Sequence, residues 1–453
     1  MKRLFRLKIL LIGLAALLCF PSAAEALTVP KDELIDVTAV PGRPDAPLVD
    51  APSIILIEAG SKAILYSKDA DTAYYPASIT KIMTALIVIE NCELEENVTF
   101  SYRATHELEA GSSGIARTEG EIMTVRDCLY ALLVASANEV AQALAEHVSG
   151  SIEAFAELMN KRAAELGCTN THFANPSGLN DENHYTTCHD MALIMCEAIK
   201  HPEFVEIDST TDYTIPATNK HSDSLRVFMK HDLLRGSEKY KYAVCGKTGY
   251  TSLAGFTLVT SAAKDGMNLI CVALHCSSAK ERADSTKTLF DYGFDNYKFY
   301  SINEADPSVS GSGTSNSFLS PNVISLAVPD TAGLCIAGEI PFSALTSQTV
   351  WEGEASLGGR IGRVFYCYED ALIGAADLLI NTEKDDPFAF LGKTSENADT
   401  DIEAGSGEKS SLYTILIISG ISVAVIVVGG IIINRFINGS TRRRKKKRRR
   451  SIR

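Results

Sequence analysis

An uncharged stretch near the C-terminus limits how this chain of 453 residues can fold. Residues 412–433 form a run of 22 residues without a charged side chain. A helix of about that length, rising about 1.5 Å per residue, crosses a bilayer core of about 30 Å. The basic residues of 435–453 follow directly, and such flanks stay on the cytoplasmic side. The sequence therefore predicts a transmembrane helix over 412–434, a basic cytoplasmic tail over 435–453 and a folded body outside the cytoplasm.

The N-terminus carries the pattern of a secretory signal. Basic residues precede an apolar run over 9–20, and the small residues Ala24 and Ala26 follow it. This pattern is typical of a signal peptide that is cleaved during export, and we assign it to residues 1–26. An uncleaved N-terminal anchor is the alternative, although the run is short for a membrane span. Both ends predict a single-pass protein of the cell membrane with an extracytoplasmic body.

The composition of the body excludes some classes of protein. Apolar residues make up 46% of the chain and charged residues 22%, so sizeable cores can form. The formal charge is −13 although ten of the last twelve residues are basic. The body is therefore strongly acidic, and we expect no nucleic-acid partner. The ten cysteines after the signal form no CxxC pair and lie mostly in apolar runs, which favours reduced, buried thiols.

The length of the body predicts two folded units. Residues 27–391 exceed the usual size of one domain. A stretch rich in Ser, Gly and Pro over 306–322 marks a loop near the junction. We therefore expect a larger domain over 27–299 and a small β-rich domain over 300–391. The acidic, Gly- and Ser-rich residues 392–411 are predicted to be a flexible linker.

Hydrophobic patterns in the larger domain predict an antiparallel sheet flanked by helices. Strands are expected over 53–59, 63–66, 242–248, 255–263 and 268–274. Helices are expected over 76–90, 124–134, 139–148, 152–166, 190–200 and 280–292. Strands on both sides of a helical middle predict an α/β chain of the α+β type. In the smaller domain, strands are expected over 323–328 and 363–368.

A serine and a lysine at the start of the first predicted helix form a candidate catalytic pair. Ser78 precedes Lys81 by nearly one helical turn, so the hydroxyl and the amine share a face within hydrogen-bonding reach. This spacing places a nucleophile beside a base, and the free N–H groups of the helix start can bind an oxyanion. The same SxxK spacing recurs from Ser277 to Lys280, so the motif needs support from its context.

Two more motifs follow along the chain. Residues 136–138, Ser-Ala-Asn, lie in a polar turn between two predicted helices and can present a hydroxyl and an amide toward a cleft. Residues 247–249, Lys-Thr-Gly, end an apolar strand, where the glycine permits close approach and the other two side chains can hold a carboxylate. Alone, each motif has an ordinary structural role as a helix cap or an edge charge. Three motifs in a fixed order are much more specific.

The order SxxK, SxN and KTG resembles the active-serine signature of penicillin-binding proteins and serine β-lactamases. The sequence around these motifs is similar to that of the low-molecular-mass D-alanyl-D-alanine carboxypeptidases. The similar segments are residues 75–81, 133–139, 175–179, 184–186 and 246–251. The resemblance covers about residues 50–295 and implies a penicillin-binding-protein/β-lactamase-like transpeptidase fold. Residues 362–380 resemble, more loosely, the small all-β domain that follows catalysis in that family.

The resemblance implies a serine-type D-alanyl-D-alanine carboxypeptidase. Such an enzyme removes the terminal D-alanine from peptidoglycan stem pentapeptides through an acyl-enzyme, here on Ser78, and β-lactam antibiotics inhibit it covalently. Lys81, if neutral, would take the Ser78 proton during acylation. Ser136 would pass a proton to the leaving D-alanine. The resemblance implies no metal and no other cofactor.

The same resemblance implies a set of substrate-binding groups. Asn138 would hydrogen-bond the substrate amide and hold Lys81 in place. Lys247 and Thr248, followed by Gly249, would bind the terminal carboxylate. The backbone N–H groups of Ser78 and Tyr250 would form the oxyanion hole.

The chain departs from the family pattern at one of these positions. Many relatives carry an arginine ahead of the KTG strand, and ungapped matching places Lys230 there. Lysine keeps the charge but lacks the fork geometry of arginine. His184, Cys188 and His189 are spaced like metal ligands, yet the resemblance assigns this segment to an active-site loop, so no metal site is expected.

Three other functions stay open from the sequence. A serine β-lactamase shares the nucleophile and the KTG strand, but class A enzymes need an added glutamate to activate water, and no convincing ExxLN-like loop follows Ser136. A membrane-tethered receptor could retain the site only to bind peptidoglycan, although intact Ser78, Lys81 and Lys247 argue against it. Transpeptidation differs only in the acceptor of the acyl group.

Overall fold

A computed structural model describes residues 33–108, 111–306, 309, 311–312, 325–351 and 360–380. All of these residues belong to one structural unit. The expected signal peptide, flexible linker, transmembrane helix and basic tail lie outside the described residues. Within the described ranges, no helix is both long enough and apolar enough to span a bilayer.

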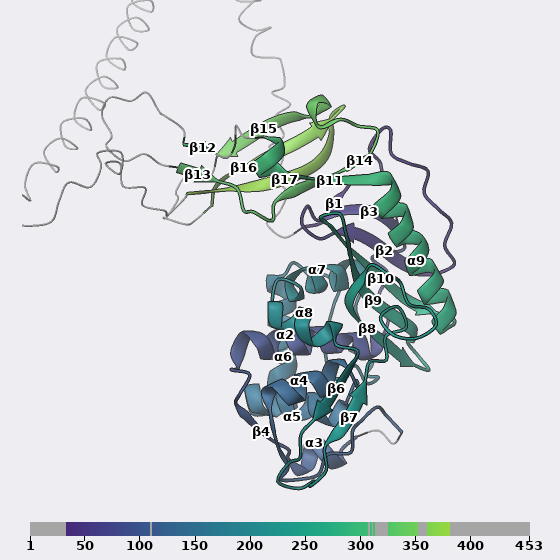
Figure 1. Ribbon diagram of the computed structural model, residues 1–453, viewed down its shortest axis with the longest axis vertical. Helices are drawn as coiled ribbons and strands as arrows, with labels where there is room; N and C mark the ends of the chain where they lie inside the picture. Colours follow the sequence, from purple (N-terminus) through teal and green to yellow (C-terminus); the bar gives the residue numbers. More distant parts are fainter. Residues whose placement is uncertain are drawn as a thin grey trace, which may run out of the picture. The chain divides into compact units, whose positions relative to one another are not determined.

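A six-stranded sheet forms the centre of the larger part of the fold (Figure 1). Neighbouring strands follow the order β1 (Ile35–Asp36), β3 (Ala63–Lys68), β2 (Ser53–Glu58), β10 (Met267–Cys276), β9 (Gly255–Lys264) and β8 (Ala243–Thr251). They pair antiparallel, except that β1 runs parallel to β3. This pairing confirms the predicted hairpin of β2 and β3. It also confirms the three predicted antiparallel strands β8, β9 and β10.

Strand β2 separates two hydrophobic cores. All six of its residues are buried, so both of its faces are covered. Because side chains alternate along a strand, Ile55 and Ile57 belong to one core while Ile54 and Leu56 belong to the other. The first core lies among most of the helices, and the second lies under a single long helix.

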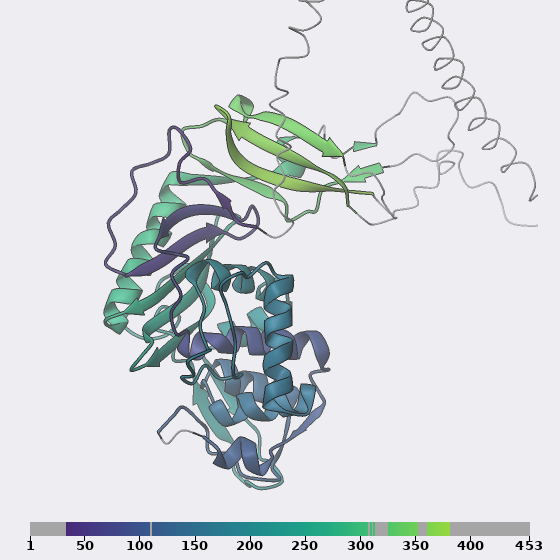
Figure 2. The same cartoon turned by 180° about the vertical axis from the view of Figure 1, so that it is seen from behind.

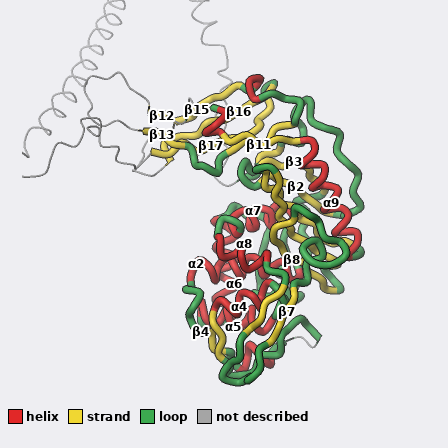
Figure 3. Tube along the Cα trace, viewed as in Figure 1, coloured by secondary structure: helices red, strands yellow, loops and turns green. Residues whose placement is uncertain are grey.

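Helices cover the two faces of the sheet unequally (Figures 2 and 3). One long helix, α9 (Ala279–Asn296), packs against β9 and β10. The remaining long helices gather on the opposite side: α2 (Lys81–Asn91), α4 (Val125–Leu133), α5 (Asn138–Ser149), α6 (Ile152–Glu165), α7 (Cys188–Ala198) and α8 (Pro202–Ser209). The helices predicted from the sequence are confirmed, with ends that differ by a few residues. Helix α8 was not predicted.

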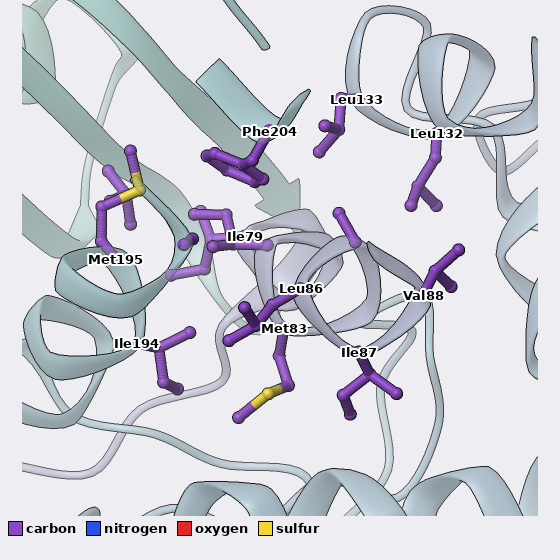
Figure 4. Packing of buried hydrophobic residues seen from close by; sticks show 14 of the residues in the cluster. Ile79, Met83, Leu86, Ile87, Val88, Leu132, Leu133, Ile194, Met195 and Phe204 are labelled. Atoms are coloured by element: carbon purple, nitrogen blue, oxygen red, sulfur yellow. The ribbon is translucent and has the colours of Figure 1, made fainter. Parts of the chain in front are cut away.

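Helix α2 runs through the middle of this helical layer. Eight of its eleven residues are buried, so it is apolar around most of its circumference. Figure 4 shows Leu86 directed toward Ile194 of α7 and Val88 directed toward Leu132 of α4. The helix is thus fixed by packing on several sides, and its first residue, Lys81, is fixed with it.

Two short ribbons at the edge of the helical layer were not predicted. They pair β4 (Asn97–Thr99) with β5 (Ile122–Thr124) and β6 (Asp212–Ile215) with β7 (Leu225–Phe228). A short helix, α3 (Tyr102–His106), lies between β4 and β5 in the sequence. Strands of three or four residues are too short for an alternating pattern to identify them.

The C-terminal part of the described chain consists mainly of strands. Strand β11 (Tyr297–Ser301) pairs with β14 (Gly333–Ala337). A five-stranded sheet has the order β12 (Gly311–Ser312), β13 (Ser325–Ala327), β17 (Ala371–Ile380), β16 (Arg360–Tyr368) and β15 (Thr346–Trp351). Its buried side chains share the second core with α9. The boundary expected between residues 299 and 300 falls within β11, and the division into two domains stays a prediction.

Candidate active site

Ser78 lies in a tight turn that leads into α2. Residues Ala77–Thr80 form a 3-10 helix, and α2 begins directly after them. Ala77 has a φ of 53°, a left-handed conformation that is strained for a residue with a side chain. The opposing Gly178 has a φ of 87°, and a Cβ there would lie 1.9 Å from the Ala77 carbonyl oxygen. The strained turn therefore fits only against a glycine, and it presents Ser78 at the surface of the helical layer.

Lys81 is the hub of the hydrogen bonds around Ser78. Its Nζ lies 2.9 Å from Ser78 Oγ, 2.7 Å from Asn138 Oδ1 and 2.6 Å from the carbonyl oxygen of Ser177. Lys81 is fully buried. Burial, followed by the charges of Lys247 and Lys230, lowers the pKa of Lys81 well below its usual range. A neutral amine held beside a serine hydroxyl can accept the serine proton.

Ser136 and Asn138 stand at the start of α5. Ser136 has a φ of 62°, so it is a second residue in the left-handed region at this site. Asn138 is the first residue of α5, and its backbone N–H donates to the carbonyl oxygen of Ser113 at 2.9 Å. The turn thus directs the Asn138 amide toward Lys81 and places Ser136 in the wall of the cavity that contains Ser78.

Strand β8 forms the opposite wall of the site. A Cβ on Gly249 would lie 2.9 Å from the backbone nitrogen of Ser78 and 2.4 Å from Thr257 Oγ1, so glycine allows the strand to approach the serine closely. Thr248, Gly249 and Tyr250 line the cavity. Arg282 of α9 braces this wall from behind, because its guanidinium donates to the carbonyl oxygens of Gly249 and Thr257, each at 3.0 Å.

Lys247 lies behind the cavity wall with a buried carboxylate as its neighbour. Its side chain is buried, and its Nζ donates to the carbonyl oxygen of Thr248 at 3.1 Å. Helix α8 packs against β8 and carries Asp208, whose carboxylate is fully buried. Burial lowers the pKa of Lys247 to about 7, and Asp208 opposes this effect. Burial raises the pKa of Asp208, and Lys247 opposes that shift in turn.

The cavity has a volume of about 470 Å³, which is enough for a small ligand. Seven of the nine residues predicted for the site line it: Ser78, Ser136, Asn138, Lys230, Thr248, Gly249 and Tyr250. The other two, Lys81 and Lys247, are buried beside it. The basic side chains of Lys230 and Arg282 line the cavity, and no acidic side chain does so among the described residues. This lining suits a ligand with a negative end.

Lys230 stands at the mouth of the cavity. Its Nζ lies 3.2 Å from Ser113 Oγ. Desolvation lowers the pKa of Lys230, and the buried Glu139 opposes this shift. The Glu139 carboxylate also accepts a hydrogen bond from the backbone N–H of Ile115, so it ties the loop around Ser113 to α5.

Four contributors to the site were not predicted from the sequence: the Ser177 carbonyl, Glu139, Asp208 and Arg282. The sequence of residues 175–179 resembles the family, which indicated that this segment belongs to the site. It did not indicate that the Ser177 carbonyl oxygen contacts Lys81. The other three are single charged residues on helices, and no sequence pattern distinguishes them from surface charges.

Two other sequence patterns, the second SxxK copy and the segment with His184 and Cys188, make contacts within the fold. In the second SxxK copy, Lys280 is 74% exposed in its side chain and pairs with Asp284, one turn along α9. His184 is buried, where its Nε2 lies 2.9 Å from Thr80 Oγ1 and its Nδ1 accepts from the backbone N–H of Ala174. Cys188 instead contacts Ser53 Oγ at 3.2 Å. His184 and Cys188 therefore contact different partners, and the Nδ1 atom of the neighbouring His189 lies 3.4 Å from Asp190 Oδ1.

All ten cysteines after residue 26 lie within the described part of the chain, and each is a free thiol there. Seven are buried, and the others, Cys92, Cys168 and Cys367, are partly exposed.

A serine nucleophile with a buried lysine base, set between a helical layer and an antiparallel sheet, defines an active-serine enzyme of the penicillin-binding type. A family model described as D-alanyl-D-alanine carboxypeptidase matches residues 41–278. The chain belongs to this family, and it is a serine-type carboxypeptidase among the low-molecular-mass penicillin-binding proteins.

Curated relatives agree with this assignment. D-alanyl-D-alanine carboxypeptidase DacF of Bacillus subtilis is 35% identical over 269 residues, which cover 57% of this chain and 66% of that protein. D-alanyl-D-alanine carboxypeptidase DacA of Haemophilus influenzae is 33% identical over 274 residues, which cover 58% of this chain and 67% of that protein. The match therefore spans about two thirds of each relative.

Solved structures show the same fold. Penicillin binding protein 5 from Haemophilus influenzae superposes with a TM-score of 0.61 at 28% identity, covering 75% of this chain and 98% of that one. The Streptomyces K15 DD-transpeptidase superposes with a TM-score of 0.53 at 29% identity, covering 56% of this chain and all of that one (100%). The chain thus has the α/β transpeptidase fold with a small C-terminal β-sheet.

Proposed function

We propose that this carboxypeptidase removes the terminal D-alanine of peptidoglycan stem pentapeptides through an acyl-enzyme on Ser78. The observation that carries the proposal is the 2.9 Å contact between Lys81 Nζ and Ser78 Oγ at the edge of the cavity. The low pKa of Lys81, caused by burial and nearby cations, supports its role as the base.

Acylation follows from these positions. Lys81 takes the Ser78 proton, and Ser78 Oγ attacks the carbonyl carbon of the penultimate D-alanine. The backbone N–H groups of Ser78 and Tyr250 stabilise the oxyanion. When the peptide bond breaks, Ser136 passes a proton to the leaving D-alanine, and Lys81 returns a proton to Ser136. Water then attacks the ester, which releases the shortened peptide and restores the Ser78 hydroxyl.

Binding of a free C-terminus follows from the charges around the cavity. Lys230 offers an ammonium at the mouth, and Thr248 offers a hydroxyl on the β8 wall. Lys247, whose protonated form is favoured by Asp208 and disfavoured by burial, supplies positive charge from behind this wall in that form. Asn138 binds the substrate amide while it keeps its contact with Lys81. A terminal carboxylate is the natural partner of such a cationic end.

We further propose that the enzyme is anchored by residues 412–434 and acts on the extracytoplasmic side of the cell membrane. The support is the uncharged run, the basic tail behind it and the signal pattern over 1–26. Residues 300–391 would form an all-β domain that sets the distance between the catalytic site and the membrane. Deleting that domain while keeping the anchor should alter wall processing in cells but leave hydrolysis of soluble peptide unchanged. Unchanged wall chemistry would argue against the spacer role.

The decisive test of catalysis measures D-alanine release from a soluble stem-pentapeptide mimic. The wild-type chain should release D-alanine, and the Ser78→Ala variant should not. Intact mass spectrometry after brief penicillin exposure should show one adduct, which maps to the peptide containing Ser78. No release above the Ser78→Ala background would leave only the receptor function. Rapid turnover of a cephalosporin without a stable adduct would indicate a β-lactamase instead.

A further inference from the structure

Three side chains of different chemistry meet on the helical layer, away from the active site. Cys92 Sγ, one carboxylate oxygen of Glu96 and one ring nitrogen of His147 all lie within 4.8 Å of one another. Cys92 caps the C-terminus of α2, directly after its last residue, and His147 lies in the last turn of α5. Glu96 Oε2 is 3.0 Å from His147 Nε2. A thiol, a carboxylate and an imidazole therefore point into one partly exposed site.

This donor set matches the ligand preferences of zinc. Zn²⁺ binds cysteine sulfur at about 2.3 Å and histidine nitrogen or carboxylate oxygen at about 2.0 Å, usually in a tetrahedron. Ligand atoms of such a tetrahedron lie about 3.3 to 3.5 Å apart. The three ligand atoms lie no more than 4.8 Å apart, so each separation is within about 1.5 Å of that spacing. Three protein ligands leave the fourth position for water.

The surrounding charge also favours a cation. The C-terminal ends of α2 and α5 meet here, and helix C-termini carry partial negative charge. The segment 92–96 contributes three glutamates. Arg126 is committed to Glu95, and within the described residues the only ion pair recorded for Glu96 is the one with His147.

A second three-residue group provides a contrast. Glu90, Glu197 and His201 are as close together as the first group. There, however, the Arg162 guanidinium lies 2.6 Å from Glu90 and 3.2 Å from Glu197, so it already occupies the position of the cation. This second group is therefore an ion-pair network, and its residues serve as a matched control.

We propose that Cys92, Glu96 and His147 form a Zn²⁺ site. In the metal-free chain, burial and then the charge of Glu96 raise the pKa of the Cys92 thiol to about 11, so the thiol carries its proton. Binding exchanges that proton for the metal: the S–H bond breaks, a sulfur–zinc bond forms and one proton is released to solvent. The hydrogen bond between Glu96 and His147 is replaced by their shared contact with the metal.

The site has a structural consequence for catalysis. Helix α2 begins with Lys81 and α5 begins with Asn138, and these two side chains are hydrogen-bonded at 2.7 Å. The zinc ligands Cys92 and His147 join the opposite ends of the same two helices, about 14 to 17 Å away along their axes. A bound metal would therefore clamp the helix pair that holds the catalytic lysine.

The test titrates Zn²⁺ into the full-length chain in detergent after treatment with chelator and reductant. Competition with a coloured chelator should show one tight equivalent of Zn²⁺, and Co²⁺ substitution should give a thiolate-to-metal charge-transfer band. Cys92→Ser and His147→Gln should each weaken binding by about tenfold or more and abolish the band. His201→Gln and Cys367→Ser should leave both unchanged. Far-ultraviolet circular dichroism checks that each variant is folded.

The outcomes separate the zinc site from a simple ion pair. If the wild-type chain retains no zinc, or if Cys92→Ser binds as tightly as the wild type, Glu96 and His147 form only an ion pair and the proposal is wrong. If His201→Gln abolishes binding instead, the metal occupies the other group and the proposal is also wrong. None of these readouts depends on peptide hydrolysis, so the result stands apart from the proposed function.

Discussion

Replacing Asp208 by asparagine tests how the buried lysine of the KTG motif keeps its charge. Asp208 lies on α8 against β8, and its side chain is fully buried. Its charge is the main influence that opposes the loss of the Lys247 proton. Asparagine has nearly the same shape, so the substitution removes the charge and leaves the packing in place.

The magnitude follows from the position of Lys247. An opposite charge at close range shifts a pKa by about 1 to 3 units, and 2 units correspond to about 2.7 kcal/mol. In the variant, the pKa of Lys247 should fall from about 7 to roughly 5. At pH 7 the protonated fraction then drops from about one half to about one hundredth. Lys247 acts as a cation, so its contribution exists below its pKa and is lost as the pH rises through it.

The assay is the pH dependence of kcat/KM for D-alanine release from a peptide with a free C-terminus. The alkaline limb should move about two units to lower pH in Asp208→Asn, and kcat/KM at pH 7 should fall about 50-fold. Glu203→Gln, an exposed carboxylate on the same helix, is the control and should leave the profile unchanged. An unmoved alkaline limb in a folded Asp208→Asn variant would mean that Asp208 is neutral in the native site and would refute the reasoning.

Three further substitutions probe the cavity mouth, the serine turn and the core. Lys230→Arg restores the forked donor that many relatives carry at this position. It should lower the KM for a stem-pentapeptide mimic about two- to tenfold in steady-state kinetics. An unchanged KM would show that Lys230 does not contact the substrate carboxylate. Gly178→Ala forces a Cβ against the Ala77 carbonyl oxygen. The variant should lose about 1–3 kcal/mol in free energy of unfolding, and a fluorescent penicillin should acylate it more slowly. A melting temperature and an acylation rate equal to those of the wild type would contradict this. Leu86→Ala, at a fully buried position of α2, should cost about 2–5 kcal/mol in urea unfolding. Leu253→Ala, at a position that is 54% exposed, should cost less than about 0.5 kcal/mol. An equal loss of unfolding free energy in Leu86→Ala and Leu253→Ala would show that the packing around α2 is loose.

Local spacing was enough to predict the core of the site. The three-residue separation of Ser78 and Lys81 predicted a shared face, and the two groups lie 2.9 Å apart even though the helix starts as a 3-10 turn. The predicted contact of Asn138 with Lys81 is present at 2.7 Å across 57 residues of sequence. That prediction came from the family resemblance, because spacing alone cannot join two helices.

The residues that sequence reasoning missed act through tertiary contacts. The Ser177 carbonyl reaches Lys81 across 96 residues of sequence, and a backbone oxygen leaves no trace in residue type. Arg282 lies on α9, which was predicted from its apolar pattern, and Asp208 lies on α8, which was not predicted. A charged residue on a helix is normally exposed. Only the packing of α8 and α9 against β8 and β9 reveals that both side chains are buried.

Lys81 and Asn138 stand on the first residues of two buried helices, and this arrangement has a consequence for antibiotic sensitivity. A substitution near the far end of either helix can tilt its axis and move a catalytic group by a fraction of an ångström, without touching any atom that a drug contacts. Reduced acylation by β-lactams can therefore arise at positions that inspection of the binding cleft would overlook.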